Sequence, residues 1–201
     1  MAAMILRPWV VLLAAGGSRR FGGPKLLARL QRETLLRRAA RAAVGCRPAG
    51  CVVVLGAHAQ RLQRELRGLP VEVVVNQRWR AGLSGSLRAG IGALPQDARA
   101  VLVFLADQAA IGPAELELLI AAWRRAPRAI VAARAGEVRG PPAILPCSTF
   151  GALRRLRGDT GARKLLVEPG RRVIEVEIPG AARDVDRPTD LTQFAGFRVL
   201  S

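Results

Sequence analysis

The chain of 201 residues contains no tyrosine, one histidine and three cysteines. Its apolar runs stay short of the ~18 residues that a membrane-spanning helix needs, so the sequence predicts no such helix. The single histidine, His58, has no cysteine or carboxylate neighbours and would make a poor metal site. The cysteines include no C-x-x-C pair, which indicates reduced, structural thiols and a cytoplasmic protein.

Lysine is also scarce. Only Lys25 and Lys164 occur, so the formal net charge of +17 comes almost entirely from arginine. Such a basic chain could attract nucleic acid. However, the three Trp and five Phe residues are not interleaved with basic ones as a base-stacking surface would require. We therefore expect no nucleic-acid partner and interpret most arginines as solvated positions on helices. Examples are Arg37, Arg38, Arg41, Arg61, Arg64 and Arg67.

Strand-like and helix-like segments alternate along the chain. Apolar runs typical of strands span 9–14, 51–55, 71–75, 100–105, 129–133 and 173–178. Apolar residues recur at three- and four-residue steps within 35–43, 87–94 and 116–123, which predicts buried helix faces. The alternation predicts a doubly wound α/β fold, with a mostly parallel sheet covered by helices on both faces. No linker interrupts this alternation, so we expect one domain over residues 1–201.

The first apolar run allows two interpretations. Residues 10–15 follow Met1 and Arg7 and end in small residues, as a secretion signal would. They also fit a first strand that carries a glycine-rich loop to the carboxyl edge of the sheet, where ligands bind. Cleavage near Ala15 would remove that strand from the fold. We therefore favour the strand and a cytoplasmic location.

The loop over 16–25 has the composition of an anion site. Its first two glycines allow positive φ and close backbone approach, so N–H groups can converge on an anion. Its serine adds a hydroxyl donor, and its arginines and lysine would bring cationic donors to phosphate oxygens. The loop matches neither a Walker A nor a G-x-G-x-x-G pattern, and an ordinary strand-to-helix turn is the alternative. These residues are Gly16, Gly17, Ser18, Arg19, Arg20 and Lys25.

Six blocks, in order along the chain, resemble those of nucleotidyltransferases that act on the molybdenum cofactor. They are LAAGGSRRFGGPK at 13–25, NQRWRAGLSGSLRAG at 76–90, LADQ at 105–108, RGPP at 139–142, LRGDTGAR at 156–163 and DVDRPTDL at 184–191. The resemblance is greatest to the molybdenum cofactor cytidylyltransferase branch, which has a Rossmann-like nucleotidyltransferase fold. Relatives that transfer a guanylyl group commonly have glycine where this chain has Ala15.

The resemblance implies an Mg²⁺-dependent enzyme. It would move CMP from CTP to the terminal phosphate of the molybdenum-pterin cofactor, release pyrophosphate and serve molybdoenzyme maturation. The implied catalytic residues are Arg20, Lys25 and Asp107, with Asp107 and Asp186 as metal ligands. The implied nucleotide-binding residues are Leu13, Ala14, Ala15, Gly16, Gly17, Ser18, Arg19, Gly22, Asn76 and Ser86. The implied acceptor-binding residues are Gly140 and Arg163.

Several of these assignments have alternatives. Asp107, Asp159 and Asp186 could each cap a helix, and Ser86 could simply begin one. The acceptor could be a sugar or alcohol phosphate, or the chain could bind a cofactor without catalysis. The intact set Arg20, Lys25 and Asp107 argues against a non-catalytic role.

Overall fold

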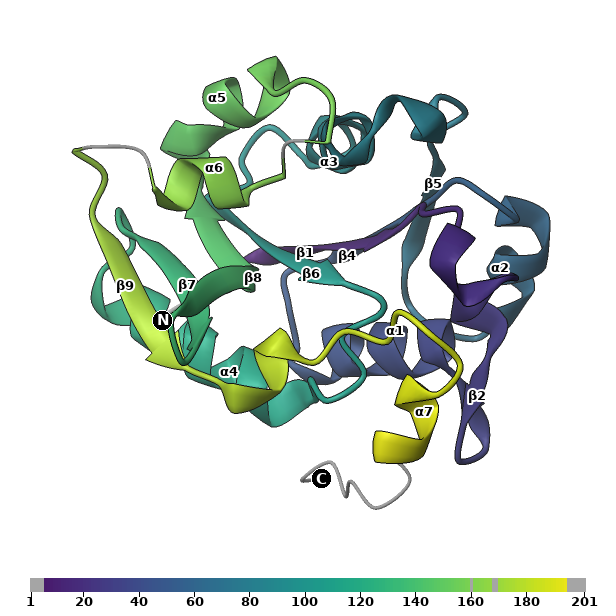
Figure 1. The fold of residues 1–201 in the computed structure, drawn as a ribbon. Helices are drawn as coiled ribbons and strands as arrows, with labels where there is room; N and C mark the ends of the chain where they lie inside the picture. Colours follow the sequence, from purple (N-terminus) through teal and green to yellow (C-terminus); the bar gives the residue numbers. More distant parts are fainter. Residues whose placement is uncertain (1–5, 160, 168–169, 195–201) are drawn as a thin grey trace.

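The computed structural model describes residues 6–159, 161–167 and 170–194, and within them a seven-stranded sheet runs through the middle of the molecule (Figure 1). The strand order is β5-β4-β1-β6-β8-β7-β9. Pairing is parallel except at β8, which runs antiparallel to both β6 and β7. The strands are β1 (Trp9–Ala14), β4 (Cys51–Leu55), β5 (Glu72–Val75), β6 (Ala100–Leu105), β7 (Ile130–Ala135), β8 (Val138–Pro146) and β9 (Val173–Glu177). A short hairpin, β2 (Arg29–Leu30) and β3 (Glu33–Thr34), stands apart from this sheet.

Helices cover both faces of the sheet (Figure 1). One face packs against α1 (Leu35–Gly45), α2 (Ala59–Glu65) and α4 (Pro113–Arg125). The other face packs against α3 (Leu83–Gly92), α5 (Phe150–Arg155) and α6 (Arg163–Leu166). A final short helix, α7 (Asp190–Gln193), follows the segment after β9. None of the helices in the described part of the chain is long and apolar enough to cross a membrane.

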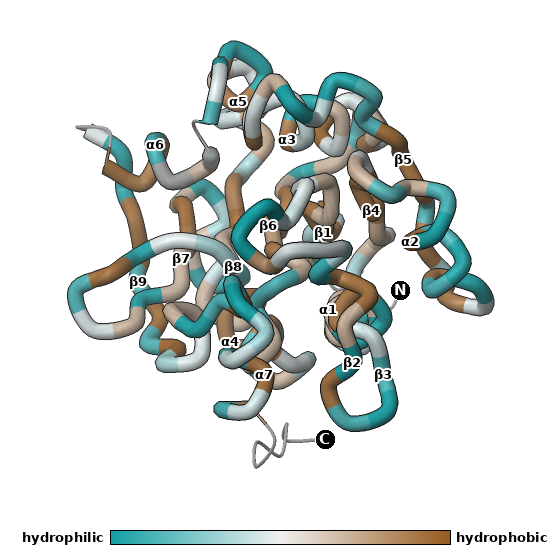
Figure 2. The backbone as a smooth tube through the Cα atoms, turned by 45° about the vertical axis from the view of Figure 1, so that its right-hand side comes forward, coloured by the Kyte–Doolittle hydropathy of each residue, from teal (hydrophilic) through white to brown (hydrophobic). Residues whose placement is uncertain are grey.

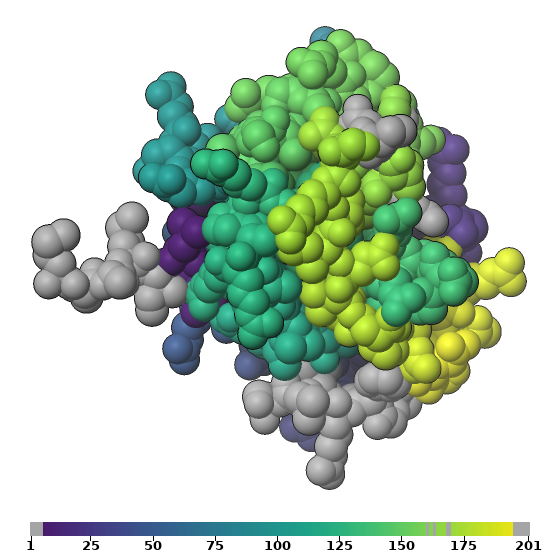
Figure 3. Space-filling view, turned by 90° about the vertical axis from the view of Figure 1, so that its left-hand side faces the viewer, coloured from purple at the N-terminus to yellow at the C-terminus, as the bar shows by residue number. Residues whose placement is uncertain are grey.

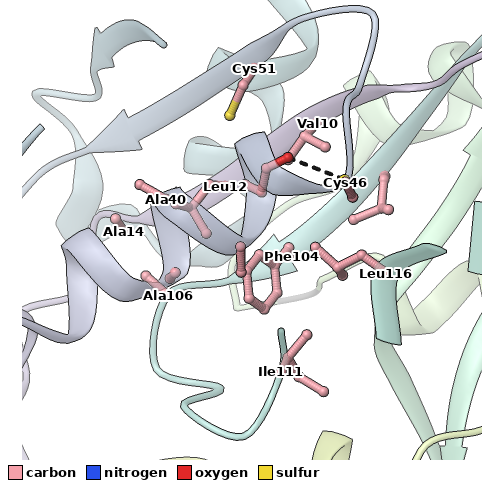
Figure 4. Close-up of a cluster of buried hydrophobic side chains, with 14 of the residues drawn as sticks. Val10, Leu12, Ala14, Ala40, Cys46, Cys51, Phe104, Ala106, Ile111 and Leu116 are labelled. Atoms are coloured by element: carbon pink, nitrogen blue, oxygen red, sulfur yellow. Dashed lines mark hydrogen bonds between the residues drawn. The ribbon is translucent and has the colours of Figure 1, made fainter. Parts of the chain in front are cut away.

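The central strands are apolar throughout because both of their faces are buried. In β1, Val10 and Leu12 face the α1 side, whereas Val11 and Leu13 face the α3 side. Figure 2 shows these strands as hydrophobic segments in the interior, with hydrophilic turns outside. On the α1 side, Phe104 is fully buried among the side chains drawn in Figure 4. Each strand therefore joins two cores.

The thiols lie as structural cysteines do. Cys46 and Cys51 are buried, and burial raises the pKa of each to about 12, so both remain protonated. The Cys46 thiol donates a hydrogen bond to the carbonyl of Ala43 over 3.1 Å (Figure 4). Cys147 is exposed and free.

The doubly wound fold and the mostly parallel sheet are confirmed, and each of the six predicted strands exists. The sequence reasoning missed β8 because prolines interrupt it. Pro141 and Pro142 fall at an irregularity in the ladder, where the pairing of β7 with β8 shifts between Ala132–Ala143 and Ala133–Gly140. Proline has no N–H group to donate, so at such an irregularity it removes no hydrogen bond from the sheet. Figure 3 shows the far edge of this sheet, with β9 in yellow-green on the molecular surface.

Two arginines are less solvated than the sequence predicts. Arg37 donates to the carbonyl of Glu65 over 2.8 Å, and Arg38 donates through Nε to the carbonyl of Ala109 over 3.1 Å. Both are half-buried, and burial lowers the pKa of Arg38. The Arg38 contact ties α1 to the loop that follows β6. The other four, Arg41, Arg61, Arg64 and Arg67, are exposed as expected.

Candidate active site

A cleft of about 510 Å³ opens where β1 and β6 end. This is the edge of an α/β sheet at which ligands usually bind. Its lining brings together the glycine loop, the turn after β6, the start of α3 and the segment after β9. The predicted site residues that line it are Leu13, Ala14, Ala15, Gly16, Gly17, Ser18, Arg19, Arg20, Lys25, Ser86, Asp107 and Asp186.

The glycine loop achieves its shape differently from the prediction. Positive φ occurs at Ser18 (53°) and Gly22 (75°), not at Gly16 or Gly17. Gly17 is needed instead for close approach, because a Cβ there would lie 2.7 Å from Cζ3 of the Trp79 ring. Gly16 has open space around its Cα. Where Gly16 lines the cleft, the loop therefore leaves open space beside its backbone.

Two cations and two carboxylates form a connected cluster in the cleft. The ammonium of Lys25 lies 2.7 Å from Oδ2 of Asp107 and 3.4 Å from Oδ1 of Asp186. Arg20 donates through Nη1 to the other oxygen of Asp186 over 2.7 Å. The Lys25 side chain is only 10% exposed, whereas that of Arg20 is 75% exposed. Lys25 is therefore a nearly buried counterion, and Arg20 reaches the cluster from the solvent side.

Backbone contacts hold the carboxylates in place. The carbonyl of Asp107 accepts a hydrogen bond from the N–H of Val185 over 3.0 Å. Val185 is fully buried, which anchors the segment that carries Asp186. Gln108, also buried, donates to the carbonyls of Pro141 (2.8 Å) and Ala181 (3.0 Å). The turn after β6 is thus fastened to two other segments of the fold.

The geometry argues against helix capping by the aspartates. The helix after Asp186 begins at Asp190, whose own Oδ2 accepts from the N–H groups of Asp186 and Arg187, both over 2.8 Å. The helix after Asp107 begins beyond Gly112, whose N–H is bonded to Glu115. Neither Asp107 nor Asp186 acts as a cap.

Asp159 does not cap α6 either, because the N-cap of that helix is Ala162. Asp159 lines the cleft instead. A Cβ atom on Gly82 would lie 2.7 Å from its Oδ1, so Asp159 packs closely against this glycine. The block at 156–163 therefore borders the cleft through this aspartate, and Thr160 lies outside the described residues.

Asp184 belongs to the same cluster, and the sequence reasoning missed it. Asp184 is exposed on one side, but partial desolvation on the side that faces the cluster raises its pKa to about 6. The negative charge of Asp107 and, more weakly, that of Asp186 act in the same direction, while Lys25 opposes them. The D-x-D spacing at 184–186 was the available signal, since the buried residue between the two aspartates holds both within electrostatic reach of Lys25.

Four other predicted residues are not among those that line the cleft: Gly22, Asn76 and Gly140, and Arg163, whose side chain is not described. Asn76 donates through Nδ2 to the hydroxyl of Ser86 over 3.1 Å, so it orients a lining residue. Ser86 itself lines the cleft and also lies in the first turn of α3. Gly22 follows the 3₁₀ turn Arg19–Phe21, and Gly140 lies in β8 opposite Ala133. Arg163 begins α6, and its side chain lies outside the described part of the structure.

The cluster suits a divalent cation best together with a nucleotide, whose phosphates would add further oxygen ligands. Among the described residues, no three Asp, Glu, His or Cys side chains are arranged to hold a metal ion. Mg²⁺ is usually bound by one or two carboxylates together with phosphate oxygens and water. The oxygens of Asp107 and Asp186 fit that requirement once the cation now paired with them has moved.

A glycine loop, two cations and paired carboxylates at this edge are typical of a nucleotide-binding protein of the doubly wound class. Comparison with known families makes the class specific. Residues 10–173 match the model of the MobA-like NTP transferase domain, and the chain belongs to this family.

Individual relatives agree with this placement. The chain is 33% identical over 167 residues to nicotine blue oxidoreductase of Paenarthrobacter nicotinovorans, covering 78% of this chain and 79% of that protein. The structure resembles that of Rv0371c from Mycobacterium tuberculosis H37Rv, with a TM-score of 0.81, 28% identity and coverage of 96% and 100% of the two chains. A manganese complex of Rv0371c gives a TM-score of 0.81 and 27% identity, with coverage of 94% and 98%.

The raised pKa of Asp184 leads to a stability prediction. Its folded-state pKa of about 6 exceeds the ordinary 3.8, so ionised Asp184 lowers the free energy of unfolding at any pH above about 6. We expect Asp184→Asn to raise the midpoint of thermal unfolding at about pH 7.5. The gain should fade as the pH falls through 6 and vanish below 3.8, where the carboxyl group is protonated in both states. Asp97→Asn, an exposed site elsewhere, is the control. Equal midpoints for wild type and Asp184→Asn at about pH 7.5 would contradict this prediction.

The Lys25 ion pairs lead to a metal-binding prediction. In the nucleotide-free protein the ammonium occupies the position of a cation between Asp107 and Asp186. Removing this charge should strengthen binding of Mn²⁺ by at least ~10-fold, because the carboxylates lose their internal counterion. We expect this in Lys25→Met and Lys25→Gln, measured by paramagnetic resonance of free Mn²⁺. Lys164→Met, at the other lysine, should bind Mn²⁺ as the wild type does. Unchanged or weaker binding in both Lys25 variants would show that the ammonium does not compete with the metal.

Proposed function

We propose that this protein transfers CMP from CTP to the terminal phosphate of the molybdenum-pterin cofactor, with Mg²⁺, and that it works in the cytoplasm as one domain over residues 1–201. The observation that carries the proposal is the cluster of Lys25 and Arg20 with Asp107 and Asp186, set beside the glycine loop in one cleft. Family membership supports a nucleoside triphosphate as substrate. The six sequence blocks support the choice of nucleotide and acceptor.

The reaction is a displacement at the α-phosphorus of CTP. An oxygen of the acceptor phosphate forms a bond to that phosphorus, and the bond to the oxygen bridging to the β-phosphate breaks. The electron pair of the broken bond leaves with pyrophosphate. Since the acceptor phosphate is already an anion, no side chain has to remove a proton from it. The protein has to align the two phosphates and offset the negative charge between them.

The described residues fit these tasks. N–H groups of the glycine loop would bind phosphate oxygens, and Ser18 would add a hydroxyl. Lys25 and Arg20 would transfer from their carboxylates to the triphosphate, where their positive charge offsets the charge that develops at the α-phosphate. Asp107 and Asp186 would hold Mg²⁺, which supplies charge neutralisation and alignment of the phosphate oxygens when bound. The manganese complex of a structural relative supports a divalent cation in this fold.

The acceptor would enter from the side of the cleft that Arg20 and Asp186 border. Both are more exposed than Lys25, so an incoming phosphate can reach them. We propose Gly140 and Arg163 as further acceptor contacts. A sugar or alcohol phosphate is the alternative acceptor, and the released pyrophosphate measured with each candidate distinguishes them.

The first test removes the charge of Asp107. Asp107→Asn keeps the shape of the side chain but cannot offset the ammonium or hold the metal, so turnover should fall by at least ~10²-fold. The assay follows pyrophosphate release from CTP in the presence of the pterin cofactor. Circular dichroism should show an unchanged fold, and Asp97→Asn should remain active. Near-normal turnover of Asp107→Asn would refute the metal assignment.

The second test concerns the choice between CTP and GTP. Ala15 is buried and lines the cleft, so its methyl group takes space that a glycine would leave to a purine. One methyl group is worth ~1–3 kcal/mol in such a pocket, so CTP should be preferred but GTP not excluded. Ala15→Gly should narrow the ratio of kcat/KM values for CTP and GTP, while the ratio for CTP and UTP stays the same. Equal kcat/KM for CTP and GTP in the wild type would contradict the cytidylyl assignment.

The name of the relative from Paenarthrobacter nicotinovorans favours a second candidate, a redox reaction on an organic molecule. Such a reaction needs an electron donor, consumes no triphosphate and makes no use of cations placed for phosphate charge. Incubation with NADH or NADPH and a quinoid dye, followed by absorbance of the reduced nicotinamide, separates the two candidates. We expect no protein-dependent oxidation.

A further inference from the structure

The charged cluster occupies one side of the cleft, and an arginine stands on the other. In the sheet, β4 and β6 flank β1 on opposite sides. Asp107 follows the end of β6, whereas Trp79 packs at Gly56, directly after β4. Trp79 and Arg80 both line the cleft on this second side, together with Ser86 at the start of α3. The mechanism proposed above gives Arg80 no role.

The turn that carries Arg80 is held in place at several points. A Cβ on Gly17 would lie 2.7 Å from the Trp79 ring, and a Cβ on Gly56 would lie 2.6 Å from Cβ of Trp79. The tryptophan is therefore wedged against two glycines that leave no space for a larger residue. At the start of the turn, Oδ1 of Asn76 accepts from the N–H of Arg78 over 3.0 Å. The position of residue 80 is thus fixed by its neighbours.

The guanidinium of Arg80 lies on the indole. Its Cζ is 4.4 Å from the ring centroid of Trp79, which is a cation–π contact. This contact covers a face of the indole, so that face is not a platform on which a base could stack. An arginine stacked by its face keeps the N–H groups along its edge available for parallel hydrogen bonds in its own plane.

Arg80 also differs from Arg20 in its electrostatic partners. Arg20 pairs with Asp186, whereas no carboxylate in residues 6–159, 161–167 or 170–194 forms an ion pair with Arg80. Arg80 is exposed at the cleft, so its donors face solvent in the free protein. A ligand that offers two adjacent acceptors would satisfy them.

We propose that Arg80 is a specificity-determining residue that reads the nucleobase, donating two parallel hydrogen bonds to N3 and O2 of cytosine. This inference rests on the proposed function for the orientation of the nucleotide. With the triphosphate at Lys25 and Asp107, the nucleoside half extends toward Ser86 and Arg80. Cytosine presents N3 and O2 as neighbouring acceptors. Uracil has the same size but carries a hydrogen on N3, so it cannot accept both bonds.

Arg80 and Ala15 therefore discriminate between nucleotides in two different ways, which can be measured separately. Ala15 acts by volume and discriminates a pyrimidine from a purine, whereas Arg80 acts by hydrogen-bond pattern and discriminates CTP from UTP. A bidentate arginine contact to a base is typically worth ~1–3 kcal/mol of discrimination, which predicts a preference for CTP over UTP of roughly 10- to 100-fold. Neutral or lysine substitutions at residue 80 should remove most of it.

The experiment measures equilibrium binding of CTP and of UTP, each with Mg²⁺ and without acceptor, by titration calorimetry. The proteins are the wild type, Arg80→Gln, Arg80→Lys and Arg78→Gln. We expect both Arg80 variants to lose affinity for CTP by about tenfold or more while affinity for UTP changes little. Arg80→Lys tests the planar fork, because it keeps the charge. Arg78, two residues earlier, is exposed but does not line the cleft, so Arg78→Gln should keep the wild-type preference.

Two results would overturn the inference. Equal losses for CTP and UTP in Arg80→Gln, with recovery in Arg80→Lys, would assign Arg80 to a phosphate. Unchanged binding of both nucleotides would remove it from the site. The proposed transfer reaction can fail independently of this inference. If the protein binds CTP selectively through Arg80 but releases no pyrophosphate with the pterin cofactor, the inference stands and the proposed function is wrong.

Discussion

The ion pair between Lys25 and Asp107 joins parts of the chain that are far apart in sequence. Lys25 ends the loop after β1, Asp107 follows β6, and Asp186, the second partner of the ammonium, lies beyond β9. A nearly buried ammonium needs a carboxylate nearby, and carboxylates this close to one another need a cation between them. The strand ends must therefore meet at one edge of the sheet, and the N–H of Val185 bonded to the Asp107 carbonyl fixes that meeting point.

Under the proposed function, the same pairing explains how one cleft would bind both a metal and a highly charged nucleotide. In the free protein the site is neutralised internally, with ammonium and guanidinium serving as counterions for the carboxylates. A metal triphosphate brings its own cation for the carboxylates and its own anions for Lys25 and Arg20. Binding then exchanges one set of ion pairs for another and leaves no charge without a partner. On the opposite side of β1, Trp79 and Arg80 present an indole ring and a guanidinium edge, which the proposed contact with the base would use.

The sequence predicted the fold well because apolar periodicity reports which faces are buried. The apolar runs identified the six other strands of the sheet but missed β8. Consecutive prolines argue against a strand unless an irregularity in the pairing accommodates them. Residue types alone indicated an anion site at the glycine loop and Lys25, whereas Asp107 was assigned through the resemblance of its block to a family motif. The reason for Gly17 was wrong, because contact with an indole sixty residues away leaves no local signal.

Long-range packing also concealed other parts of the site. Asp184 was passed over because only the folded chain shows that Asp107 lies beside it and that partial desolvation raises its pKa to about 6. Helix capping was a reasonable alternative for Asp186 until the structure showed that α7 begins at Asp190, with Thr189 as its N-cap. Arg80 resembled any other exposed arginine in a chain rich in them. Stacking on Trp79 at the cleft distinguishes it.

The exchange of ion pairs at Lys25 is the central claim, and the scarcity of lysine makes it directly measurable. Protein labelled with ¹³C at the lysine ε-carbon should give two signals, from Lys25 and Lys164, which Lys164→Arg would assign. Saturating Mg²⁺ and CTP should shift the Lys25 signal and leave that of Lys164, which is exposed on α6, in place. A Lys25 signal that stays unchanged when calorimetry shows the nucleotide to be bound would contradict the account.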